Sequence, residues 1–278
     1  MTRTPLAPVA AGTGAQARRA LRLLAVGGAI SYRALFGWLS PWIFIPSMLA
    51  VPIFQVLLFA YIGKSAGVGD NEFYLIGNAV QYAAVPCLFA MENMIAGERL
   101  TQTLGLIITS PAPRLPLFLG RALPVVANGW VVSMFTLVAG GLVLDVSIGA
   151  PALLAIALVM VVASASCTGL GLVIGGIGLR VREGAVLNGL VFGALLIVSG
   201  ANVPLASLPG WVSGVGRVVP FTHAIEACRA LAAGGSLGDV SGSIGTEALI
   251  GGVYGLAGLL LIHSLERVSR RRATLETY

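Results

Sequence analysis

Six apolar stretches, each long enough to cross a lipid bilayer, constrain the fold of this chain most strongly. A hydrocarbon core about 30 Å thick is crossed by roughly 20 apolar residues in a helix. The predicted spans are residues 41–63, 73–96, 115–144, 151–179, 185–203 and 244–265. Charged residues make up only 10% of the 278 residues, compared with about 25% in soluble domains. The sequence therefore predicts an all-α integral membrane protein and excludes a water-soluble enzyme, a disordered chain and a nucleic-acid-binding domain.

Basic residues in alternate connections predict the orientation of these spans. Of the 17 lysines and arginines, all but Lys64, Arg217 and Arg229 fall on one side of the predicted bundle. Because short basic connections stay in the cytoplasm, we expect six spans in the plasma (inner) membrane with both termini cytoplasmic. Residues 1–16 are then a disordered cytoplasmic N-terminus, and residues 266–278 form a basic cytoplasmic tail.

Residues 17–40 carry arginines on one side of a predicted helix and leucines on another. A removed signal peptide is disfavoured, because Arg33 interrupts the apolar run and no clear small-residue cleavage site precedes the next span. We predict an interfacial amphipathic helix. The transmembrane domain follows over residues 41–265.

The two long connections differ in composition. The cytoplasmic link, residues 97–113, begins with charged residues and ends in the proline-containing sequence SPAP, which predicts a helix with a defined stop. The outer link, residues 199–242, is too apolar for a free loop and is interrupted by Pro204, Pro209 and Pro220. It predicts a re-entrant helical segment, since irregular backbone at membrane depth must be covered by protein or water.

Polar side chains recur at helical spacing along the second span. As a hypothesis, they line a translocation path whose members are Asn78, Gln81, Tyr82, Phe89, Glu92 and Asn93. Polar groups are unfavourable in lipid, so this stripe should face the protein interior or water. Glu92 is the one acidic residue that we assign to a span. Two interpretations of it stay open: it faces the path, or it reaches the membrane interface from the cytoplasmic end of the span.

Small residues in the fourth and sixth spans predict close helix packing. They are spaced four apart in both spans: Ala163, Cys167, Gly171 and Gly175, then Gly251 and Gly255. Such spacing lets helix backbones approach closely. We favour packing within the chain over a seam between two copies, because these faces are common throughout polytopic membrane proteins.

The chain lacks the residue patterns of an enzyme or a metalloprotein. The Gly-Lys-Ser fragment around Lys64 is no phosphate-binding loop, because Leu58 stands where that motif requires glycine. The three cysteines are far apart, and neither histidine has a second ligand at metal spacing. His223 and Glu226 are three residues apart, which favours a structural hydrogen bond over an acid–base pair. We therefore expect no catalytic residue, metal or cofactor in this chain.

Two stretches resemble a known family. The first, residues 98–121, contains the elements ER, TL, TSP and LGR, and the second, residues 199–229, contains SGANVPL, LPGW, VPFT and EACR. Together they are similar to the membrane-spanning subunit of ABC-2 exporters, the group that includes daunorubicin-type drug-resistance permeases. The sequence departs from the family pattern at Gln102, where glycine is common, and at Val219, where asparagine often precedes the proline.

The resemblance implies a type V exporter architecture and a division of labour between subunits. The link between spans two and three would be a coupling helix that docks on a separate ATPase subunit, which binds ATP and magnesium. The implied coupling residues are Glu98, Arg99, Thr101, Gln102 and Thr103. The implied outer gate contains Ser199, Asn202, Pro204, Pro220 and Glu226. A second permease, identical or related, would complete the transporter.

The resemblance also implies export of a hydrophobic small molecule such as a drug or an antibiotic. Export of a polysaccharide or a lipid-linked glycan is the alternative, although the aromatic content of 7% is low for a sugar conduit. An ion-coupled secondary transporter is the alternative of another class. It would have only Glu92 as an assigned intramembrane acid.

Overall fold

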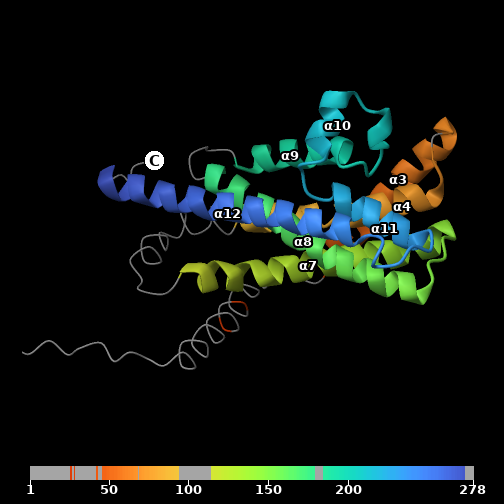
Figure 1. Ribbon diagram of the computed structural model, residues 1–278, viewed down its shortest axis with the longest axis horizontal. Helices are drawn as coiled ribbons and strands as arrows, with labels where there is room; N and C mark the ends of the chain where they lie inside the picture. The colour runs from red at the N-terminus through yellow and green to blue at the C-terminus, as the bar shows by residue number, and fades with distance from the viewer. Residues whose placement is uncertain are drawn as a thin grey trace, which may run out of the picture.

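The computed structural model describes residues 46–67, 69–93, 114–178 and 184–272, together with residues 26, 28 and 42. The helices of these ranges lie mainly along one long axis (Figure 1). In chain order they are the π-helix η1 Pro46–Ala50, α3 Val51–Ala66, α4 Asn71–Gln81, the π-helix η2 Val85–Phe89, α7 Arg114–Leu144, α8 Ala150–Gly178, α9 Gly184–Val198, the 3-10 helix η3 Leu205–Ser207, α10 Gly210–Gly216, α11 Thr222–Ala232 and α12 Ser241–Arg272. Strands are absent from this described part, as the all-α prediction expects.

Five helical stretches are long and apolar enough to cross a membrane. They are Met48–Ala66, Asn71–Asn93, Gly120–Leu144, Ala150–Gly178 and Ser241–Ser264. The fifth predicted span corresponds to α9, which has 15 residues and is shorter than the roughly 20 that a full crossing needs. Six spans therefore remain a prediction.

Several predicted boundaries shift in the structure. The helix α9 ends at Val198 rather than at 203, and α12 continues to Arg272, beyond the predicted start of the tail. The predicted amphipathic helix over 17–40 and the coupling helix over 97–113 lie outside the described ranges, apart from the isolated residues 26 and 28.

The second predicted span is interrupted rather than continuous. The helix α4 ends at Gln81, and the π-helix η2 follows after a short turn. Pro86 lies within η2 and has no N–H for the regular helical hydrogen bond. Just before Pro86, the Val85 N–H donates to the Tyr82 oxygen at 3.2 Å, three residues back, whereas the Cys87 N–H keeps the regular bond to the Ala83 oxygen, four residues back, at 3.1 Å. The irregular segment packs among α7, α8 and α9, so its backbone is covered by protein.

Glycines bring α8 and α12 together over much of their length (Figure 1). A Cβ atom added to Gly169 would lie 2.7 Å from the Gly251 oxygen, and one added to Gly258 would lie 2.6 Å from the Leu172 Cβ atom. Backbones this close leave no room for a side chain. Of the glycines in the predicted series, Gly251 lies in this contact, because its added Cβ atom would lie 2.6 Å from the Ser166 Cα atom. An added Cβ atom on Gly255 would meet no atom within 4 Å, and one on Gly171 would meet Cys87 and Met91 rather than α12.

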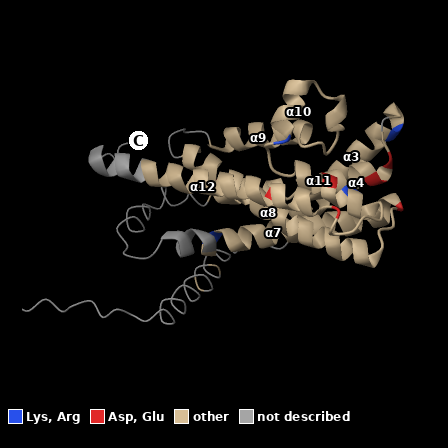
Figure 2. Cartoon of the chain, in the orientation of Figure 1, with Lys and Arg blue, Asp and Glu red and all other residues tan. Residues whose placement is uncertain are grey.

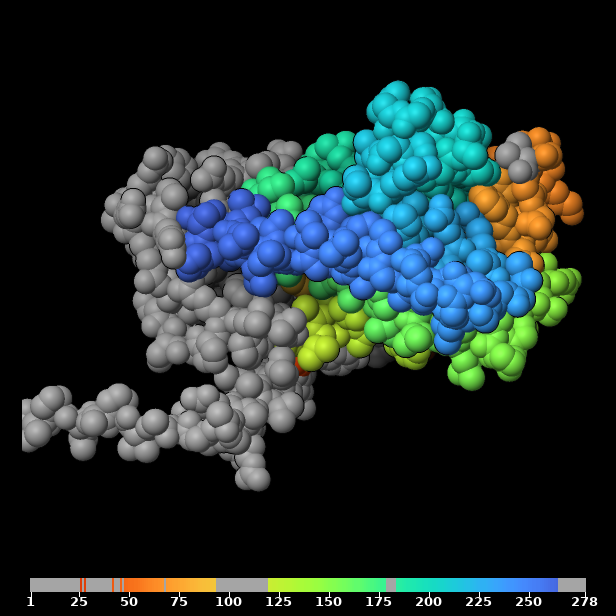
Figure 3. All heavy atoms as spheres, viewed as in Figure 1, coloured from red at the N-terminus to blue at the C-terminus, as the bar shows by residue number. Residues whose placement is uncertain are grey.

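The opposite face of α12 is apolar and exposed. Figure 3 shows α12 in blue, running across one side of the molecule. Its exposed large side chains are Leu249, Val253, Leu256 and Leu260. Charged side chains are sparse along the described helices and several gather around the ends of α3 and α4 and around α11 (Figure 2). This distribution suits a bundle whose long faces contact lipid.

The connection between α9 and α12 is folded into the short helices η3, α10 and α11. Pro204 precedes η3 and Pro209 precedes α10, so prolines separate the short helices. The part around α10 projects from one side of the bundle (Figures 1 and 3). We refer to residues 199–240 as the connecting segment. Its helical character agrees with the prediction, whereas its depth in a membrane remains a prediction.

Candidate functional site

The polar residues predicted along the second span point mainly into the chain. Asn78, Gln81 and Tyr82 are buried, and only 7% of Glu92 is exposed. Phe89 is half-buried and Asn93 is exposed. The stripe therefore faces the protein interior, as expected for polar groups in a membrane. Its role as a path lining remains a hypothesis.

Asn78 connects three parts of the chain. Its amide nitrogen donates to the Tyr74 oxygen at 2.9 Å and to the Asn202 side-chain oxygen at 2.8 Å. Its amide oxygen accepts a hydrogen bond from Gln55 of α3 at 3.2 Å. The Asn202 amide nitrogen in turn donates to the Leu196 oxygen at 3.2 Å. Asn78, which is predicted for the path, is thus hydrogen-bonded directly to Asn202, which is predicted for the outer gate.

Arg229 of α11 fastens the start of the connecting segment to α4. Its guanidinium donates to the oxygens of Gly200, Ala201 and Phe73, each at 3.0 Å. It also lies 3.5 Å from the centroid of the Phe73 ring, a cation–π contact. Carbonyls just beyond a helix end lack helical partners, and a cationic side chain can satisfy them. Burial lowers the pKa of Arg229 to about 10, so the guanidinium stays charged at neutral pH.

Close approach at this point requires glycine. A Cβ atom on Gly77 would lie 2.7 Å from an Arg229 nitrogen and 2.9 Å from the Ala201 Cα atom. Gly200 has a φ of 78°, a conformation that glycine adopts without steric penalty. These two glycines allow the connecting segment to turn away from α9 and lie against α4.

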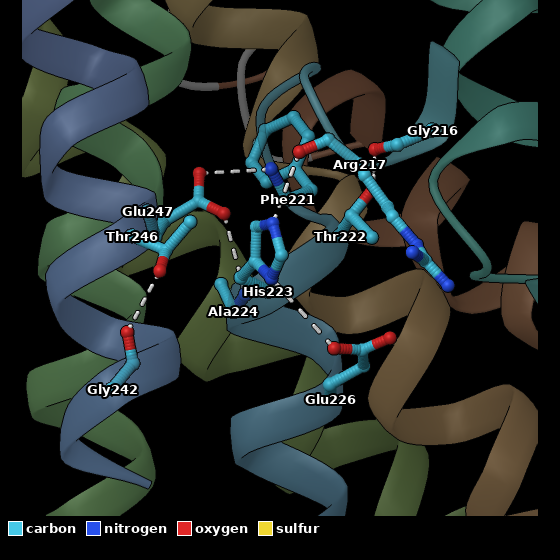
Figure 4. Close-up of polar contacts among 10 residues, drawn as sticks. All are labelled: Gly216, Arg217, Phe221, Thr222, His223, Ala224, Glu226, Gly242, Thr246 and Glu247. Atoms are coloured by element: carbon cyan, nitrogen blue, oxygen red, sulfur yellow. Dashed lines mark hydrogen bonds and ion pairs between the residues drawn. The ribbon is translucent and has the colours of Figure 1, made fainter. Parts of the chain in front are cut away.

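Glu247 of α12 binds the first turn of α11 (Figure 4). The Phe221 N–H donates to one carboxylate oxygen at 2.9 Å, and the Ala224 N–H donates to the other at 3.3 Å. The side chain is completely buried. N–H groups in a first helical turn have no helical acceptor and carry a partial positive charge, so a carboxylate there is both hydrogen-bonded and electrostatically favoured.

The assignment of Glu92 as the only acidic residue in a span was wrong. Glu247 lies within the apolar stretch 244–265 and within the helix Ser241–Ser264. The sequence signal that could have identified Glu247 is its position as an acidic residue inside an apolar stretch. Its partners could not be inferred locally, because Phe221 precedes it by 26 residues.

Glu92 is held differently, at the start of α9. One carboxylate oxygen accepts a hydrogen bond from the Asn188 amide at 3.3 Å. A Cβ atom on Gly184, the first residue of α9, would lie 3.1 Å from the Glu92 carboxyl carbon. The carboxylate therefore lies against the first turn of α9, where negative charge is favourable.

The remaining gate residues occupy different environments. Ser199 and Pro220 are buried, whereas Pro204 is half-buried. Glu226 is exposed, and its carboxylate lies 3.8 Å from a ring nitrogen of His223. The second ring nitrogen of His223 is 3.0 Å from the Arg217 oxygen (Figure 4). The structure thus joins Asn202 to the predicted path but leaves Glu226 on the outer face of α11.

The predicted coupling residues lie outside the described ranges; they are Glu98, Arg99, Thr101, Gln102 and Thr103. Within the described residues, no group of three or more histidine, cysteine or acidic side chains could hold a metal ion. Cys87, Cys167 and Cys228 are buried and not disulfide-bonded. The polar clusters around Asn78, Arg229, Glu247 and Glu92 therefore make up the candidate site.

Comparison with known proteins identifies one family. The model of a family described as "ABC-2 family transporter protein" matches residues 73–260 of the 278-residue chain. No curated protein matches the chain. The matched region begins in α4 and ends in α12, so it contains Asn78, Glu92, Arg229 and Glu247.

Proposed function

Because the chain belongs to the ABC-2 transporter family, we propose that it is the permease subunit of an ATP-binding-cassette exporter in the plasma membrane, with both termini cytoplasmic. It moves a hydrophobic small molecule, such as a drug or an antibiotic, out of the cell. A separate ATPase subunit binds ATP and magnesium, and a second permease, identical or related, completes the transporter. The family match over residues 73–260 carries this proposal.

Coupling to the ATPase takes place at the link between the second and third spans. Glu98, Arg99, Thr101, Gln102 and Thr103 contact the ATPase in this proposal, which rests on the resemblance of that link to the family pattern. ATP binding brings two ATPase subunits together and moves the coupling helices, which shifts the permeases between resting and conducting states.

The polar side of α4 forms part of the path, and the connecting segment forms the outer gate. The hydrogen bond between Asn78 and Asn202 supports this arrangement, because it links the two directly. Gln81 adds a second observation. Its buried amide has no hydrogen-bond partner among the described residues, and an unpaired buried amide is unfavourable. A polar group of the cargo, or water in a conducting state, would satisfy it.

Co-purification tests the proposal most directly. Native membranes are solubilised in a mild detergent, the chain is captured by a C-terminal tag, and its partners are identified by mass spectrometry. We expect a stoichiometric partner that contains a Walker A motif. Recovery of this chain without an ATPase, even after crosslinking at Glu98, would overturn ATP coupling and favour the ion-driven alternative.

A double substitution tests the coupling residues within the assembled complex. Glu98→Ala combined with Arg99→Ala should preserve membrane insertion but abolish stimulation of the ATPase by the permease. The matched control is Asp145→Asn, an exposed carboxylate just after α7 that belongs neither to the predicted path nor to the predicted gate, and it should leave stimulation unchanged. Normal stimulation in the double variant would contradict the coupling assignment.

A further inference from the structure

We infer that Glu247 is a positioning residue that latches the connecting segment, by holding Phe221 in a strained backbone conformation at the start of α11. The latch consists of Glu247, Phe221 and Ala224. That the latched segment is a gate rests on the proposed function. The latch itself rests on the geometry around α11 alone.

The strain lies at Phe221. Its φ is 81°, in a region that L-residues with bulky side chains rarely adopt. The Phe221 side chain is completely buried, so packing holds the ring in place although the backbone has an unfavourable conformation. The residue before it is Pro220, whose ring fixes its own φ. Contacts from elsewhere in the chain must therefore maintain the turn.

Glu247 supplies the strongest of these contacts. Each carboxylate oxygen accepts one backbone N–H, from Phe221 and from Ala224. Because the carboxylate is completely buried, water cannot replace a lost bond, and a charged acceptor forms stronger hydrogen bonds than a neutral one. The carboxylate therefore fixes the strained residue and the first turn of α11 together.

A second contact from α12 supports the same turn. The Tyr254 hydroxyl donates to the Val218 oxygen at 3.2 Å. Within the connecting segment, the Thr222 hydroxyl donates to the Gly216 oxygen at 2.6 Å, which ties α11 to α10 (Figure 4). The turn between α10 and α11 is thus held against α12 at two points.

Movement of α11 would reach the predicted gate through Arg229. This residue lies on the same helix and binds the oxygens of Gly200 and Ala201. The next residue, Asn202, binds Asn78. Release of the first turn of α11 would therefore loosen the contact between the connecting segment and α4.

Thiol labelling of the full chain in detergent micelles measures this release. Ser199→Cys places a thiol of similar size at a buried position whose hydroxyl has no hydrogen-bond partner among the described residues. The native cysteines are buried, and their reaction with a water-soluble maleimide is subtracted by using the chain without Ser199→Cys. The labelling rate then reports how often the connecting segment opens.

Glu247→Gln should raise the labelling rate on the order of tenfold. The neutral amide has one oxygen acceptor in place of two, and the loss of a charge-assisted hydrogen bond corresponds to a change of about that size. Glu247→Asp, which keeps the charge, should give a smaller increase. An unchanged rate in Glu247→Gln would overturn the latch.

The strain is tested by comparing Phe221→Gly with Phe221→Ala. Both variants remove the ring and leave a similar cavity, but only glycine adopts a positive φ freely. The latch predicts slower labelling in Phe221→Gly, by about fivefold. Equal or faster labelling in the glycine variant would show that no strain is held there, and this comparison decides the matter even if Glu247→Gln fails to fold.

The labelling experiment needs neither cargo nor ATPase. Labelling rates that contradict the latch would therefore leave the co-purification result unaffected. Absence of an ATPase partner would overturn the proposed function without altering the labelling rates.

Discussion

The two buried carboxylates, Glu92 and Glu247, both lie against the first turn of a helix, but they are held in different ways. Glu247 accepts two backbone N–H groups and is completely buried. Glu92 accepts one side-chain amide, from Asn188, and keeps 7% of its surface exposed. A backbone partner cannot rotate away, whereas a side-chain amide can. Glu247 is therefore suited to fixing a structure, and Glu92 to exchanging hydrogen-bond partners along the proposed path.

Removal of the Glu247 carboxylate should have the largest effect on stability. Glu247→Ala leaves two buried N–H groups without an acceptor, and we expect a loss of roughly 2–4 kcal/mol. Thermal unfolding in detergent, followed by a thiol-reactive dye, measures it. Glu226→Ala is the matched control on the exposed face of α11 and should change the unfolding midpoint little. Similar unfolding midpoints for Glu247→Ala and Glu226→Ala would show that the buried carboxylate stabilises the protein no more than the exposed one.

Displacement of α12 should disturb Glu247 indirectly. Gly258→Ala would place a Cβ atom 2.6 Å from that of Leu172, and overpacking of this kind costs typically 1–3 kcal/mol. Gly252→Ala is the control, because no atom lies within 4 Å of its added Cβ. We expect a lower unfolding midpoint and faster labelling at Ser199→Cys in the first variant only. If both variants behave alike, the seam between α8 and α12 does not position Glu247.

Glu92→Gln should affect transport more than stability. The Gln oxygen can still accept the Asn188 amide, and hydrogen bonds between membrane helices contribute on the order of 0.6 kcal/mol. We therefore expect a stability change below about 1 kcal/mol. Under the proposed function, efflux of a fluorescent anthracycline from cells should nevertheless be impaired, because the proposed path loses the charge of Glu92. Unchanged efflux at equal expression would exclude Glu92 from the path.

The same two carboxylates show what the sequence could and could not predict. Glu92 was found because it belongs to a polar stripe whose period is visible within one helix. Glu247 was missed because its importance depends on Phe221 and Ala224, which become its neighbours only through the packing of α11 on α12. Close packing of the fourth and sixth spans was predicted, since small residues at a spacing of four indicate it. Gly251 belongs to the seam between α8 and α12, whereas Gly169 and Gly258, which also form it, lay outside the predicted series.

Local backbone chemistry explains where the helix ends differ from the limits of the predicted spans. Hydropathy alone treats residues 73–96 as one helix, whereas Pro86 forces the π-helix η2 into it. The helix α9 ends at Val198, two residues before the left-handed turn at Gly200. Hydropathy extended it to 203, because Ala201 and Val203 are also apolar. Apolar length thus predicts that spans exist, while proline and glycine determine where they bend and end.

An exposed carboxylate completes the comparison and should give the smallest effect. Asp239 lies just before α12 and accepts the Ser236 N–H at 2.9 Å and the Ser236 hydroxyl at 2.7 Å. These bonds lower the pKa of Asp239 below its usual value. A lowered pKa means that the stabilisation is present above the unfolded-state pKa of about 3.9 and is lost as the pH falls through the folded-state value.

Asp239→Asn should therefore leave the unfolding midpoint at pH 7 nearly unchanged, because water competes for an exposed hydrogen bond. Below about pH 4, the parent should lose slightly more stability than the variant, since only the parent has a carboxylate to protonate there. Thermal unfolding at pH 7, 5 and 3 measures the difference. Each of the two carboxylates accepts two hydrogen bonds. A loss at pH 7 as large as that of Glu247→Ala would therefore show that the number of accepted hydrogen bonds, rather than burial, determines what such a carboxylate contributes to stability in this protein.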